Sequence, residues 1–234
     1  MMKNLFVGMV LLLAFASCKK ETKDCPSSTE KTFAISGFTR ISAGETFTVT
    51  VKQGTAYSIK AKGCSNELND LLLANDNGTL TVRYNRYRSD RYRVDFEITL
   101  PTLSSIALDG VAKGTVSGFG QQANFMKVAL SGTAKCNIDQ LPPLVDVDLS
   151  GVSELTLNGT ASDLIAHLSG DSKLNAHTAS FNDADVYTSG TAVARLVVQQ
   201  SLFAQASGNS RVYYKGNPTN VNAEQSGTAK VIHE

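Results

Sequence analysis

Arginine and tyrosine are concentrated in residues 83–93, which read RYNRYRSDRYR and contain five arginines and three tyrosines. Guanidinium groups bind carboxylates and phosphates through paired hydrogen bonds, and tyrosine rings can stack on sugar rings. The segment therefore predicts a surface that contacts an acidic polymer. Its candidate binding residues are Arg83, Tyr84, Arg86, Tyr87, Arg88, Arg91, Tyr92 and Arg93. The alternative is a hairpin whose tyrosines cover the core while its arginines remain in water.

A second set of basic residues recurs three positions after each of seven similar glycines. Five of these seven positions are basic, although lysine and arginine make up only 22 of the 234 residues. The five are Lys113, Lys135, Lys173, Arg211 and Lys230. If the repeats stack, the cations form a strip that faces a polyanion, such as an acidic glycan or lipid phosphates, with Glu154 relieving repulsion between Lys135 and Lys173. The alternative is that lysines beside a bend only keep an exposed strand soluble.

Residue patterns typical of catalysis or metal binding are missing from the sequence. His167, His177 and His233 have no HExxH or CxxC motif around them, so we expect solvated histidines, no metal and no cofactor. The serines before the repeated glycines lack a G-x-S-x-G motif, and we interpret them as turn residues. We therefore expect no enzyme activity. A carbohydrate-active β-helix enzyme remains the least favoured alternative.

The first 17 residues read as a secretory signal peptide. A basic start precedes an apolar run from Leu5 to Ala16, which is shorter than the ~20 residues that a membrane-spanning helix needs. The sequence Phe15-Ala16-Ser17-Cys18 resembles a lipobox and predicts acylation of Cys18, with an ordinary cleaved signal as the alternative. Residues 18–32 are polar and predict a flexible tether. We expect a lipid-anchored protein of the cell envelope, on the periplasmic or surface face of the outer membrane, with no nucleic-acid partner.

The mature sequence contains three further cysteines, Cys25, Cys64 and Cys136. Export permits disulfides, but three cysteines cannot all pair within one chain. We expect buried or free thiols, with Cys136 on an inward position. A bridge between Cys25 and Cys64 stays open as an alternative.

The repeated glycines indicate how the chain would position these groups. Each follows Ser or Asp, and the intervals between them are 22, 19, 19, 20, 18 and 19 residues. The seven are Gly110, Gly132, Gly151, Gly170, Gly190, Gly208 and Gly227. Even offsets from each glycine are mostly apolar or small and odd offsets mostly polar, which predicts a strand on either side of a bend with one face inward. Residues 101–234 are therefore expected to form a right-handed parallel β-helix with coils of about 19 residues; a β-sandwich is the alternative.

Residues 33–100 lack this period and predict an N-terminal region of short antiparallel strands. Thr46 to Val51 alternates between polar and apolar residues, as does Val94 to Ile98. Residues 66–73 contain the one plausible helical turn. At the other end of the chain, Leu gives way to Thr188, Ala206 and Gln225 two residues before the glycines. This change predicts a tapering core or a cap with a wetter interior.

These features together resemble the head GIN domain family, whose members are described as putative auto-transporter adhesins. The resemblance rests on the lipobox, the segment Phe47–Gly54, the sequence ITLP at residues 98–101 and the serial LSGTA and LSGDS turns, and it covers residues 33–232. It implies a β-helical envelope protein with no catalytic residues to carry over. We expect a non-enzymatic protein that contacts surface polymers or acidic glycans, or alternatively an envelope scaffold.

Overall fold

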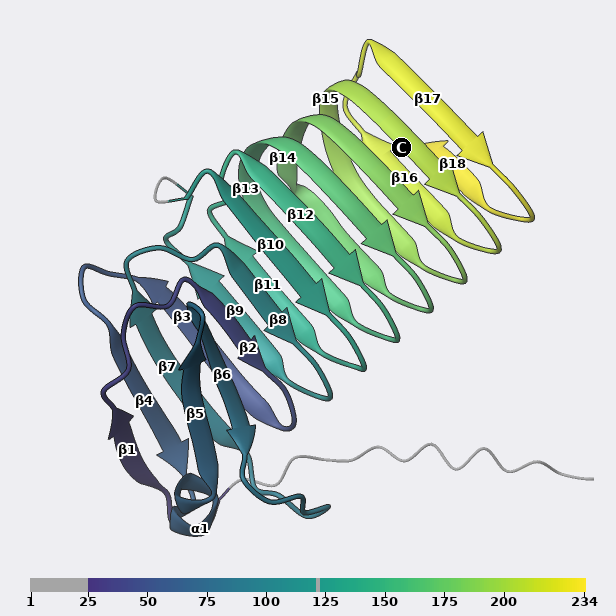
Figure 1. Ribbon diagram of the computed structural model, residues 1–234. Coiled ribbons are helices and arrows are strands. Elements are labelled where there is room, and N and C mark those ends of the chain that lie inside the picture. The colour runs from purple at the N-terminus through teal and green to yellow at the C-terminus, as the bar shows by residue number, and fades with distance from the viewer. Residues whose placement is uncertain (1–24, 121–122) are drawn as a thin grey trace, which may run out of the picture.

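A computed structural model describes residues 25–120 and 123–234 and shows a nearly all-β solenoid (Figure 1). The expected signal peptide and Cys18 lie outside the described residues. One short helix, α1 (Ser65–Asn69), interrupts a sheet of 18 strands. The strands are β1 (Thr29–Phe33), β2 (Arg40–Ala43), β3 (Phe47–Gln53), β4 (Ser58–Gly63), β5 (Leu71–Asp76), β6 (Thr79–Tyr84), β7 (Val94–Leu100), β8 (Ser105–Leu108), β9 (Lys113–Ser117), β10 (Phe125–Leu130), β11 (Lys135–Asp139), β12 (Leu144–Leu149), β13 (Glu154–Leu168), β14 (Lys173–Thr188), β15 (Val193–Ala206), β16 (Arg211–Lys215), β17 (Asn220–Gln225) and β18 (Lys230–His233).

Each coil of the solenoid turns at one of the repeated glycines. A strand leads into the corner and another leaves it, as β8 and β9 do on either side of Gly110. All seven glycines have φ between 63° and 72°. In this left-handed region a residue with a Cβ atom is strained, whereas glycine is not. Strands of successive coils pair in parallel with equivalent residues opposite one another, for example Val128 with Val147 and Val147 with Ala166. The parallel β-helix is therefore confirmed.

The core consists of inward columns that run along the solenoid. The small residue two positions after each glycine is 0–8% exposed, from Ala112 to Ala229, because the corner leaves no room for a larger side chain. Leucines two positions before the glycines pack beside this column. Where leucine gives way to Thr188, its hydroxyl forms a 2.9 Å hydrogen bond with the buried hydroxyl of Ser210, so this polar pair is satisfied inside the core. Every residue of β17 in the last coil is exposed.

The N-terminal region contains antiparallel strands, as expected, and also extends the parallel solenoid. β4 pairs antiparallel with β1 and β7, and β5 pairs antiparallel with β6. In contrast, β2 pairs in parallel with β6 and β8, while β3 pairs in parallel with β7 and β9. The β2–β3 corner has Glu45, with φ 57°, where later coils have glycine. Loop 85–93 replaces the corner between β6 and β7, so neither coil shows the glycine period.

Three local expectations require correction. Cys25 and Cys64 form a disulfide, with their Cα atoms 5.4 Å apart, so the expectation of only unpaired thiols is wrong. Antiparallel pairing of β1 with β4 sets Thr29 opposite Gly63 and so brings the two cysteines together. Residues 29–32 belong to β1 and not to a tether. The helix ends at Asn69, because the next residues enter β5.

Cys136 is a free cysteine and lies on the inward face, as predicted. Burial raises the pKa of its thiol to about 12, because the apolar core disfavours the thiolate. This cysteine therefore packs as a small apolar residue of the core.

Candidate functional site: a basic patch and a serine-lined groove

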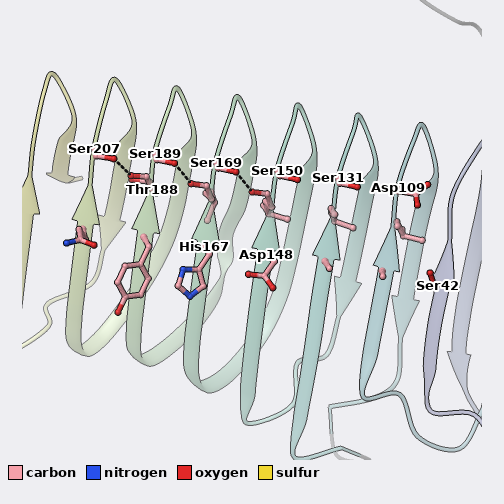
Figure 2. A pocket seen from close by; sticks show the side chains of 18 of the residues that line it. Ser42, Asp109, Ser131, Asp148, Ser150, His167, Ser169, Thr188, Ser189 and Ser207 are labelled. Carbon is pink, nitrogen blue, oxygen red and sulfur yellow. Dashed lines mark hydrogen bonds between the residues drawn. The ribbon is translucent and has the colours of Figure 1, made fainter. Parts of the chain in front are cut away.

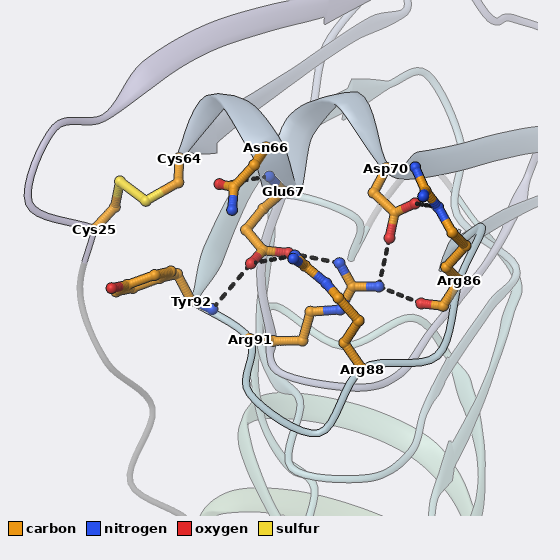
Figure 3. Close-up of polar contacts among 9 residues, drawn as sticks. All are labelled: Cys25, Cys64, Asn66, Glu67, Asp70, Arg86, Arg88, Arg91 and Tyr92. Carbon is orange, nitrogen blue, oxygen red and sulfur yellow. Dashed lines mark hydrogen bonds and ion pairs between the residues drawn. A yellow bond between two sulfur atoms is a disulfide. The ribbon is translucent and has the colours of Figure 1, made fainter.

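The arginine–tyrosine segment forms the expanded corner between β6 and β7 (Figure 3). Arg91 is 4% exposed, and its Nη1 donates a hydrogen bond to Glu67 Oε2 at 2.7 Å. Its Nη2 pairs with the Asp70 carboxylate, and the guanidinium lies 3.6 Å from the centre of the buried Tyr84 ring. Arg91 and Tyr84 therefore belong to the interior of the end coil and do not face a ligand.

Other arginines of this segment also pair within the protein. Arg88 contacts the Glu67 carboxylate at 2.7 Å, and Arg86 contacts Asp70 at 3.2 Å. The Arg91 and Arg86 guanidinium groups hold the pKa of Asp70 below its ordinary value. The segment is not a hairpin, because β6 and β7 pair with other strands and not with each other.

The remaining members of the segment lie closer to solvent. Arg93 pairs with Asp95 at 2.9 Å, and Tyr92 is half-buried. Arg83 is exposed, and the Tyr87 side chain is 90% exposed. Most of the positive charge of the segment is thus already matched by acidic groups of the same coil, which weakens its case as a binding surface.

The basic residues after the glycines form one continuous column on the outward face of the strands that leave the corners. Strand register places each member opposite the next. The column reads Lys113, Lys135, Glu154, Lys173, Val193, Arg211 and Lys230. Lys135 and Glu154 form an ion pair at 2.7 Å, and this lysine lowers the pKa of the Glu154 carboxyl.

The C-terminal half of this column forms a wider surface, which we call the basic patch. It consists of Lys173, Arg211 and Lys230 together with Arg195 and Tyr213 of the next outward column. Register places Arg195 opposite Tyr213, and the guanidinium lies 4.8 Å from the ring centre. Within residues 25–120 and 123–234, no acidic side chain forms an ion pair with any of these four cations. Sequence reasoning missed Arg195 and Tyr213, although both stand five residues after a repeated glycine.

A groove of about 730 Å³ crosses the strands that lead into the corners (Figure 2). One wall is the row of serines that precede the glycines, namely Ser131, Ser150, Ser169, Ser189, Ser207 and Ser226. The other wall is formed by residues two positions earlier in each coil, among them Asp148, His167, Tyr187 and Gln205. Asp109 and Ser42 lie at the N-terminal end of the groove, as Figure 2 shows.

The second wall of the groove contains stacked rings. His167 and Tyr187 are neighbours on β13 and β14, with ring centres 4.6 Å apart and planes 10° from parallel. Asp148 lies opposite His167 and forms an ion pair with Lys127 at 2.7 Å. Sequence reasoning interpreted the serines as turn residues and His167 as an isolated surface residue. The sequence did contain a signal for the groove. The serines and the residues two positions before them both stand at odd offsets from the glycines, so both columns face outward on the same side of the coil.

Within the described residues, no three or more His, Cys, Asp or Glu side chains are grouped so that they could hold a metal ion. In the same part of the chain, no helix is both long enough and apolar enough to span a membrane.

Comparisons with known proteins agree with this architecture. A family model described as "putative auto-transporter adhesin, head GIN domain" matches residues 37–218. No curated protein sequence matches the chain.

Several solved structures share the fold. A putative adhesin from Bacteroides fragilis is 21% identical with a TM-score of 0.81, covering 89% of this chain and 98% of its own. A putative lipid binding protein from Parabacteroides distasonis is 14% identical with a TM-score of 0.69, covering 92% and 100%. A putative adhesin from Parabacteroides merdae is 14% identical with a TM-score of 0.58, covering 90% and 98%. These structures show the fold, and the family model shows that the chain belongs to the head GIN domain family of putative auto-transporter adhesins.

Proposed function

We propose that this protein is a non-enzymatic, adhesin-like protein of the cell envelope that binds an acidic surface polymer through the basic patch. The observation that carries the proposal is the strand register. It collects Lys173, Arg195, Arg211 and Lys230 on one outward face although they are distant in sequence. Adjacent strands lie ~4.8 Å apart, so the cations repeat along the solenoid as charges repeat along a polyanion.

The chemistry of the patch supports an acidic glycan in particular. Arg195 and Arg211 offer planar donors that match carboxylate or sulfate groups, and Tyr213 adds a ring next to them. None of the four cations forms an ion pair with an acidic side chain of the described residues, whereas Arg86, Arg88 and Arg91 are engaged by Glu67 and Asp70. We therefore place the contact surface at the C-terminal half of the solenoid and not in residues 83–93.

Replacing both Lys173 and Arg211 with Gln is expected to weaken binding to polygalacturonate about tenfold. Two surface charge contacts of about 0.7 kcal/mol each correspond to this factor. The matched control replaces Lys62 and Arg83, one exposed lysine and one exposed arginine away from the patch, with Gln. Binding is measured by calorimetry at two salt concentrations, because exposed charges are screened beyond ~8 Å at physiological ionic strength. Equal affinities for the two variants would refute the basic patch, and no wild-type binding would favour an envelope scaffold.

We also propose that the protein is anchored through acylated Cys18. The support is the lipobox-like sequence before Cys18 and the polar residues after it. In cells that express the full chain, Cys18→Ala is expected to move the protein from the membrane fraction to the soluble fraction. Intact mass should show acyl chains on wild type only. A mature wild-type chain that starts at another residue, or a variant that stays with membranes, would contradict the anchor.

A further inference from the structure

The serine-lined groove differs chemically from the basic patch and lies on other segments of the coils. The groove crosses strands that lead into the corners, from β8 to β17, whereas the basic patch lies on strand segments that leave them. Its lining repeats over four successive coils, with a serine on one wall and a larger side chain on the other: Ser150 with Asp148, Ser169 with His167, Ser189 with Tyr187 and Ser207 with Gln205. A surface that repeats in this way fits an extended ligand whose own units repeat.

Backbone hydrogen bonding argues against a peptide as this ligand. The N–H of each corner serine donates to a carbonyl of the preceding coil, from Ser131 to Leu108 at 3.0 Å through Ser226 to Ala206 at 3.0 Å. Peptides that add a strand to a sheet need a free edge of backbone donors and acceptors. Because the backbone N–H and C=O groups at the corners already bond to neighbouring coils, a ligand in the groove would contact side chains instead of the backbone.

Three serine hydroxyls and the carboxylates of the groove are arranged as acceptors, while Tyr187 and Gln205 also carry donors. The hydroxyls of Ser169, Ser189 and Ser207 donate to carbonyls of the preceding coil over long distances of 3.3–3.5 Å. With their protons directed there, the serine oxygens present lone pairs to the groove. Asp109 adds carboxylate oxygens, and so does Asp148, although its Oδ2 pairs with Lys127. An array of acceptors favours a ligand rich in hydroxyl donors and disfavours an anion.

We propose that this groove is a binding site for a neutral linear glycan that lies along the solenoid axis. Its hydroxyls would donate to the serine row and to Asp148, while sugar rings pack against His167 and Tyr187. The coil spacing of ~4.8 Å is close to the length of one sugar ring, so successive rings meet equivalent serines. The chain would thus contact neutral and acidic polymers through two separate surfaces.

The proposal is tested by titrating linear neutral hexasaccharides of glucose, xylose and mannose into the full mature protein, with hexagalacturonate as the acidic comparison. At least one neutral hexasaccharide should bind with an affinity that salt leaves unchanged. Ser169→Leu, which fills the groove, and Tyr187→Ser, which removes the ring, should each weaken this binding about tenfold or more. Ser169→Ala removes only the hydroxyl and should weaken binding less than Ser169→Leu, so it also guards against a misfolded leucine variant.

Gln200→Leu is the matched control, because Gln200 is exposed and does not line the groove. It should bind like wild type, and all variants should keep the wild-type thermal midpoint. Failure of every neutral hexasaccharide to bind, or equal binding by wild type and the groove variants, would overturn the proposal. Hexagalacturonate binding that depends on Lys173 and Arg211 but not on Ser169 would leave the basic patch standing, so the two proposals can fail separately.

Discussion

Replacing Gly170 with valine should lower the free energy of unfolding by about 3 kcal/mol. The left-handed backbone conformation costs a side-chain-bearing residue roughly 1–2 kcal/mol, and crowding adds a similar amount. At φ 70°, a Cβ on Gly170 would lie 2.7 Å from the carbonyl oxygen of Gly151 in the preceding coil. That neighbour is backbone held in the parallel ladder, so the coils must move apart locally. Urea denaturation followed by circular dichroism measures the change.

Asp171→Val is the control, because it places the same side chain on the adjacent, exposed residue of the corner. It should change stability by no more than about 0.5 kcal/mol. Similar losses from both variants would mean that the stacked glycines do not determine corner geometry. Glu45 has a positive φ and carries a side chain at the β2–β3 corner. This corner tolerates a side chain because the neighbouring coil, between β6 and β7, has loop 85–93 in place of a glycine corner.

The regular coils could be predicted from sequence because each one repeats a local physical requirement. A glycine permits positive φ, a small residue fills the tight corner, and alternation separates core from solvent. These requirements are visible at Gly151 or Gly170 without knowledge of any distant contact. The same logic placed Cys136 inward and aligned Lys113 with Lys135, as the strand register confirms.

The N-terminal coils could not be predicted in this way because long-range pairing determines them. Glu45 and loop 85–93 take the place of corner glycines, so β2, β3, β6 and β7 show strand alternation but no period. The Cys25–Cys64 disulfide depends on the register of β1 against β4. Neither an antiparallel register nor a partner 39 residues away leaves a local signal.

The groove was missed for a different reason. Sequence identifies Ser169 and Tyr187 as outward residues, but a groove depends on the depth between two neighbouring columns. That depth arises from side-chain sizes in several coils at once and from the path of the chain toward each corner. Likewise, the buried position of Arg91 depends on Glu67 within the short helix α1 and on Asp70 directly after it, which reach the loop only in the folded end coil.

Replacing Arg91 with methionine is expected to lower the free energy of unfolding by about 3–5 kcal/mol, the usual cost of removing one partner from a buried ion pair. The Glu67 side chain is 1% exposed, so its carboxylate would stay buried with Arg88 as its remaining charged partner. Arg91→Lys should recover only part of the loss, because one ammonium group cannot hold both carboxylates as the guanidinium does. Thermal and urea unfolding of the disulfide-bonded protein provide the measurement.

Arg83→Met is the matched control, since Arg83 is exposed on β6 and should tolerate the change within about 0.5 kcal/mol. Low pH offers an independent check. Because Arg91 holds the pKa of Asp70 below its ordinary value, this pair stabilises the fold above the unfolded-state pKa of about 3.9 and less as the pH falls through the lower folded-state value. Arg91→Met should therefore lose less stability on acidification than wild type. If Arg91→Met were as stable as Arg83→Met but bound polygalacturonate more weakly, residues 83–93 would be a binding surface after all, and the structural role assigned to Arg91 would be wrong.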